Sequence, residues 1–137
     1  MMKKNILIIS IASVMMMSLT ACEQAQRENP LLVESDLPLD APDFSKIQVT
    51  DYLPAFQKAM EQQREAIKQI TENKDAATFE NTILAFENSG RLLDRVCRVF
   101  FALTEADKTE EIGEIEKTVQ PLLTDLDNEI SFNKPLF

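Results

Sequence analysis

The sequence contains no histidine and no tryptophan, and only two glycines and two cysteines among its 137 residues. Without histidine, the chain cannot supply a His-Glu-x-x-His zinc motif, a Ser-His-Asp triad or a Cys-His pair. Because its only glycines are Gly90 and Gly113, it has no glycine-rich phosphate loop. We therefore expect a helical chain that itself carries no catalytic residue and no metal ligand.

Positive charge is also scarce: 14 lysines and arginines face 23 acidic residues, for a net charge of −9. Residues 1–21 hold two of the lysines and no acidic residue, so their removal would change the net charge from −9 to −11. This balance argues against nucleic-acid binding, which depends on lysine and arginine neutralising phosphates. It also disfavours peripheral binding to anionic lipid. The hydrophobic content of 45% is nevertheless that of a globular protein.

The N-terminus has the pattern of an export signal. Residues 1–4 include two lysines, and residues 6–19 are uncharged and mostly apolar. This run is shorter than the roughly 20 residues that a membrane-spanning helix needs. The sequence Leu-Thr-Ala-Cys at residues 19–22 resembles the lipobox of bacterial lipoproteins, whose cysteine is acylated and becomes the new N-terminus. We predict a lipoprotein signal peptide over residues 1–21 and lipid attachment at Cys22; the alternative is a plain signal peptide with a chance cysteine.

Cys97 is then the one other cysteine, with no partner for a disulfide in this chain. A reactive thiol needs a histidine or a cationic setting. Arg95 and Arg98 are close in sequence but fall on other faces of a helix. We therefore expect Cys97 to be a small buried hydrophobic residue.

The acidic run "TEEIGEIE" at residues 109–116 is the other candidate for chemistry. In this run Glu110 and Glu111 each lie one helical turn from Glu114. The run lacks the alternating Asp/Asn pattern of an EF-hand, and its glycine is not at the turn position. It is predicted to be a solvated helix face near a helix N-terminus, where the dipole favours acidic residues.

The rest of the chain divides into a tether, an extended segment and helices. Residues 22–28 form a short polar tether. Residues 29–50 hold three prolines and are predicted to be extended. The segment also holds apolar residues that a free linker would not need, so we expect it to pack on the helices; the alternative is a partly ordered leader with exposed leucines. These residues are Leu31, Leu32, Val33, Leu37, Leu39, Phe44, Ile47 and Val49.

Residues 51–137 are predicted to form three helices. The first has Thr50 as its N-cap and runs to about Glu72, the second follows the cap Thr78 to residue 103, and the third follows the cap Thr109. Gly90 is expected to mark a kink or a close crossing with a neighbouring helix, and Pro121 to kink the third helix. The expected apolar positions are Leu53, Phe56, Met60, Ile67 and Ile70, then Phe79, Ile83, Phe86, Leu93, Cys97 and Phe100, then Ile112, Ile115, Val119, Leu122, Leu126 and Ile130.

The second half of the middle helix, residues 92–103, is apolar on nearly every side. A surface helix normally has one apolar stripe and one charged face. We expect the first and third helices to pack against this middle helix and to leave part of its apolar flank uncovered. The sequence therefore predicts that the unit docks onto further protein.

Five stretches carry a family resemblance: "NPLL" at residues 29–32, "LPLDAPDFSKI" at 37–47, "DYLPAFQKAM" at 51–60, "TFENTILAFENSGRLLDRV" at 78–96 and "VFFALTEAD" at 99–107. In this order they resemble the start of bacterial peptidyl-dipeptidases of the thimet oligopeptidase family. The most specific piece is "FENTI" at residues 79–83. The resemblance covers about residues 29–137, essentially the whole mature chain.

The resemblance implies that this chain is the all-α N-terminal segment of a larger, mostly helical zinc metallopeptidase that releases dipeptides from short peptides. In that family two histidines and a glutamate hold the zinc and another glutamate serves as base, far downstream of the region seen here. No site residue can therefore be carried onto this chain. The expected partners are the catalytic part of the same protein, peptide substrates, and a bacterial membrane reached through acylated Cys22, on its periplasmic or outer face.

A second hypothesis comes from a different class of protein. The chain would be a stand-alone lipid-anchored helical bundle that binds a partner protein through the apolar flank of residues 92–103. The size of the native protein separates the two hypotheses.

Overall fold

The computed structural model describes residues 27–136, and all regular structure within that range is helical. The elements are the 3₁₀ turn η1 (Pro38–Asp40), the helix α2 (Val49–Thr71), the π-helix η2 (Phe79–Leu84), and the helices α3 (Ala85–Ser89), α4 (Arg91–Ala106) and α5 (Glu110–Ser131). The predicted all-α fold is confirmed. Within the described range, no helix combines the length and apolarity needed to cross a membrane.

The helix α2 starts before the predicted cap. Gln48 has the extended backbone of an N-cap residue, whereas Thr50 already lies inside the helix, so the predicted Thr50 cap is wrong. The backbone N–H of Gln48 donates to Asp51 Oδ2 at 2.7 Å, and the Gln48 side chain closes the reciprocal capping box. The carboxylate at the third helical position therefore fixes the start of α2 more strongly than the threonine hydroxyl does.

The predicted middle helix is a chain of three elements. Thr78 caps it as predicted, because its Oγ1 accepts a hydrogen bond from the backbone N–H of Asn81 at 3.1 Å. The first six residues, however, form the π-helix η2, and α3 ends at Ser89, followed by its C-cap Gly90 with φ −93° and ψ 0°. A Cβ on Gly90 would lie 3.0 Å from Gln63 Nε2 of α2. Gly90 thus marks both the interruption and the close approach that the sequence predicts.

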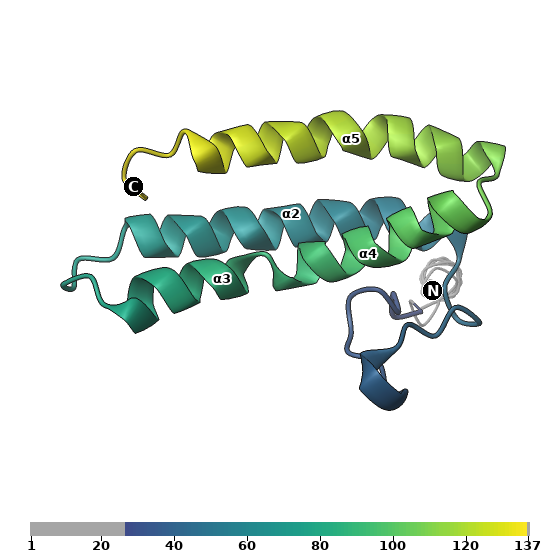
Figure 1. Ribbon diagram of the computed structural model, residues 1–137, viewed down its shortest axis with the longest axis horizontal. Helices are drawn as coiled ribbons and strands as arrows, with labels where there is room; N and C mark the ends of the chain where they lie inside the picture. Colours follow the sequence, from purple (N-terminus) through teal and green to yellow (C-terminus); the bar gives the residue numbers. More distant parts are fainter. Residues whose placement is uncertain (1–26, 137) are drawn as a thin grey trace, which may run out of the picture.

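The helix α5 is capped as predicted, with Thr109 Oγ1 accepting from the Ile112 amide at 3.3 Å. The helix α4 extends to Ala106, so the connection to α5 is only residues 107–109. The helix α5 continues through Pro121 without a break and is bowed along its length (Figure 1). Pro121 therefore does not divide the third helix.

The central helix of the bundle is α2. It packs against α3, α4 and α5, and it lies between α5 and the α3–α4 pair (Figure 1). The expectation that the middle helix would be central is wrong. The reason is visible in α2, where Ala55 and Ala59 are 0% and 1% exposed and leave room for neighbouring backbones to approach.

The core is densest beside the first half of α2. The Phe100 ring lies edge-on to the rings of Tyr52 and Phe56, with centroids 5.1 and 5.3 Å apart. From α5, the buried residues are Ile112, Val119 and Leu126. Leu31 reaches the same core from the segment before α2 and is 3% exposed.

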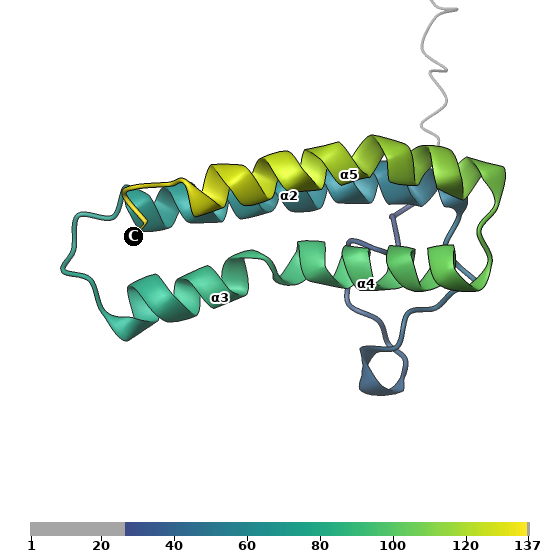
Figure 2. The same ribbon diagram turned by 45° about the horizontal axis from the view of Figure 1, so that its top comes forward.

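The start of the described chain is bound to the start of α2. The Arg27 guanidinium forms an ion pair with Asp51 and donates to the Lys46 carbonyl at 3.1 Å. The Asn29 side chain donates to the Asp51 carbonyl at 2.8 Å. Figure 2 shows this N-terminal part near one end of the long axis and the C-terminus at the other.

Candidate functional site

An open groove lies between the segment before α2 and the helix α4. It encloses about 1020 Å³, with Pro42 and Phe44 on one side and Arg91, Arg95 and Arg98 on the other. The three arginines recur at helical spacing, so they share one face of α4. Three acidic residues, Glu34, Asp40 and Asp94, line the same groove, so its positive and negative charges balance.

Two of the three arginines already have partners. Arg98 forms a two-point ion pair with Asp94, with distances of 3.0 Å from Nε to Oδ1 and 2.7 Å from Nη2 to Oδ2. Arg95 donates from Nη2 to the Leu31 carbonyl at 3.3 Å and so ties α4 to the segment before α2. Its Nε is buried without a hydrogen-bond partner. The contacts of Arg95 therefore hold a loop against a helix.

Cys97 lies on the same helix but has no reactive setting. Its side chain is half-buried and forms no disulfide within the described residues. Burial raises the pKa of the Cys97 thiol to about 11, and the charge of Asp94 adds to the rise. At neutral pH the thiol stays protonated, which fits the predicted role as a small apolar residue.

The acidic run forms the first turns of α5, as predicted. Glu114 pairs with Lys117 at 2.6 Å, and Glu110 and Glu111 are exposed. Within residues 27–136, no group of three or more histidine, cysteine or acidic side chains is arranged to hold a metal ion. The described residues thus do not fit a zinc ion. Cys22 and the predicted signal peptide lie outside the described residues.

The exposed apolar surface is not where the sequence predicts it. In the stretch 92–103, Val96, Val99 and Phe100 are at most 6% exposed, and no large apolar side chain is strongly exposed. The expected uncovered flank is found only in part, because Leu92, Leu93, Phe101 and Leu103 are half-buried and pack against the core.

Instead, η2 carries three of the nine exposed large apolar residues of the described range. Phe79, Ile83 and Leu84, which we call the distal patch, are 64%, 52% and 45% exposed. Sequence periodicity placed Phe79 and Ile83 on the core face. Periodicity could not reveal that the chain turns away at Gly90. An apolar stripe indicates that a helix face is covered, but it does not identify the neighbour that covers it. The π-helix itself had no signal in the sequence.

No protein-family model matches the chain. Over 109 residues it is 44% identical to the dipeptidyl carboxypeptidase of Escherichia coli (strain K12) and 42% identical to the dipeptidyl carboxypeptidase of Salmonella typhimurium (strain LT2). Each match covers 80% of this chain but only 16% of the relative. The predicted resemblance to bacterial peptidyl-dipeptidases is confirmed. The chain is peptidase-related and corresponds to a small part of these relatives.

Proposed function

We propose that this chain is the N-terminal, non-catalytic helical segment of a lipid-anchored zinc peptidase that releases dipeptides from short peptides. The observation that carries the proposal is the 44% identity to a dipeptidyl carboxypeptidase over 109 residues that make up only 16% of that relative. A match this strong, over so small a share of the relative, fits one structural segment of an enzyme.

The chemistry of the chain agrees with a supporting role. It has no histidine, and its described residues offer no cluster suited to a metal ion. The zinc ion, its ligands and the general base would therefore belong to residues other than these. The contribution of this segment is a bundle built around α2, with a covered core and two apolar surfaces left open, one on η2 and one around Phe44.

The membrane anchor is the second part of the proposal. Acylation of Cys22 would hold the protein at the bilayer, since each buried methylene contributes about 0.8 kcal/mol. Arg27, five residues later, is fixed against Asp51 at the start of α2. At roughly 3.5 Å per extended residue, Arg27 would lie within about 18 Å of the anchor.

The proposal is tested first by the mass of the native protein. An antibody against residues 51–73 is used to probe the membrane fraction of the source cells. A membrane-bound species several times larger than 15.6 kDa is expected. A species near 15.6 kDa would overturn the proposal and favour the stand-alone lipoprotein with a separate binding partner.

Two further measurements separate the parts of the proposal. The Cys22→Ser variant is expected to move from the membrane to the soluble fraction, while Cys97→Ser, the matched control, stays at the membrane. The purified 137-residue chain is expected to show no peptidase activity. Dipeptide release by a pure sample that a chelator abolishes would contradict the non-catalytic role.

A further inference from the structure

The distal patch concentrates three large apolar side chains in one six-residue element. Phe79, Ile83 and Leu84 are all at least 45% exposed, although η2 is well formed and capped by Thr78. π-Helices are rare, appear mostly as single turns inside α-helices, and are frequent at functional sites. A capped π-helix that presents apolar side chains to water has the properties of an interaction surface.

A hollow lies on the side of the η2–α3 stretch that faces α2. It encloses about 390 Å³ between the end of α2 and the η2–α3 stretch. Small residues leave the space open, among them Ala66 of α2 and Ala85 and Ser89 of α3. Amide side chains, including Asn81 and Asn88, lie at its edge. Such a hollow accepts an inserted side chain and offers hydrogen bonds to the polypeptide that carries it.

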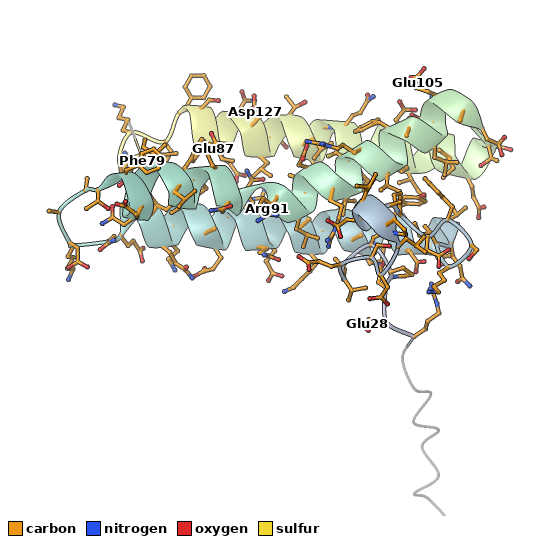
Figure 3. All side chains as sticks on the ribbon, turned by 60° about the horizontal axis from the view of Figure 1, so that its bottom comes forward. Glu28, Phe79, Glu87, Arg91, Glu105 and Asp127 are labelled. Carbon is orange, nitrogen blue, oxygen red and sulfur yellow. The ribbon has the colours of Figure 1, made fainter. Side chains whose placement is uncertain are left out.

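The path of the chain indicates which polypeptide that is. The C-terminus lies at the end of the bundle where α2 ends and η2 begins, in both Figure 1 and Figure 2. Phe132, the C-cap residue of α5, is 79% exposed. Figure 3 shows Phe79 at this end and Glu28 far from it along the long axis. A chain that continued beyond residue 137 would emerge at the same end of the bundle as the distal patch.

We propose that the distal patch is the docking surface for the part of the longer peptidase that follows residue 137. The proposal rests on the proposed function, in which this chain is one segment of a protein as long as the relatives of which it covers 16%. The docked polypeptide covers Phe79, Ile83 and Leu84 and inserts a side chain beside Ala85. The tethered end of the bundle, at Arg27, stays free of this contact.

The test uses single cysteines as reporters of exposure. Phe79→Cys is placed in the patch, and Phe44→Cys is the matched control, because Phe44 is the same residue type, is 53% exposed, and lies in the segment before α2. Each variant is made in the 137-residue chain and in the full-length native protein. Alkylation rates at each position are measured by peptide mapping, with the slowly reacting Cys97 as an internal reference.

Phe79→Cys is expected to react at least tenfold more slowly in the full-length protein than in the 137-residue chain, and Phe44→Cys to change less than twofold. Leu84→Cys, a second reporter, should follow Phe79→Cys. Equal rates at both patch positions in a protein of large native mass would overturn the docking site alone. A native mass near 15.6 kDa would overturn the proposed function, and this site with it. Protection in the 137-residue chain that grows with concentration would instead assign the patch to a second copy.

Discussion

Aromatic side chains are buried at one end of the bundle and exposed at the other. At the start of α2, which we call the proximal end, Tyr52, Phe56 and Phe100 are at most 1% exposed and pack edge to face. At the distal end, Phe79 is 64% exposed, and no residue of η2 is buried. In the sequence, Tyr52 and Phe56 lie four residues apart, at helical spacing, and so do Phe79 and Ile83.

The difference lies in the number of neighbours at each end. The proximal end is covered by α4, by the first turns of α5 and by Leu31 from the segment before α2. The distal stretch η2–α3 packs mainly on α2. A face that meets one neighbour buries one stripe, so the remaining apolar residues of η2 stay in water unless another polypeptide covers them.

The largest expected effect tests the proximal core. Phe100→Ala removes the ring that joins Tyr52 and Phe56, and we expect the free energy of unfolding to fall by about 3–5 kcal/mol. Urea unfolding followed by circular dichroism measures it. The control is Phe79→Ala, which should change stability by less than about 1 kcal/mol in the 137-residue chain. Equal losses of unfolding free energy for the two variants would show that the two ends contribute equally to stability.

The next effect concerns the start of α2. Asp51→Ala removes the carboxylate that accepts the Gln48 amide at 2.7 Å and pairs with Arg27, and we expect a loss of about 1–2 kcal/mol. The same unfolding measurement applies, with the exposed Asp36→Ala as control. A loss equal to that of the control would show that the capping box does not stabilise the proximal end.

The sequence was sufficient for the fold class, for the caps Thr78 and Thr109, and for the role of Gly90, because each depends on neighbours within a few residues. It was not sufficient for the central position of α2 or for the exposure of Phe79, which depend on contacts between distant parts of the chain. The Thr50 cap failed for a local reason, since the capping box formed by Gln48 and Asp51 places the N-cap two residues before Thr50.

The same carboxylate gives the proximal end a dependence on pH. Burial alone would raise the pKa of Asp51, but the hydrogen bonds from Arg27 and Gln48 outweigh it and hold the pKa below its ordinary value. A lowered pKa in the folded state means that the stabilisation is fully present above the unfolded pKa of about 3.9 and is lost as pH falls below it. The stability difference between the native chain and Asp51→Asn should therefore be constant from pH 7 to about 5 and shrink at lower pH. A difference that grows on acidification would contradict the assignment.

The smallest expected effect lies at Gly90, where the covered and uncovered parts of the α3–α4 stretch meet. Alanine favours helix over glycine by about 1 kcal/mol, but a Cβ there would lie 3.0 Å from Gln63 Nε2 of α2. Gln63 Nε2 is at the flexible end of a half-buried side chain, so it can move aside at some loss of packing. We expect Gly90→Ala to change the free energy of unfolding by less than about 0.5 kcal/mol, and to stabilise by about 0.5–1 kcal/mol once Gln63→Ala has removed the obstacle. Thermal unfolding of the single and double variants measures both values. A destabilisation above about 2 kcal/mol both with and without Gln63→Ala would mean that the α2 backbone, rather than the Gln63 side chain, limits how closely Gly90 approaches α2.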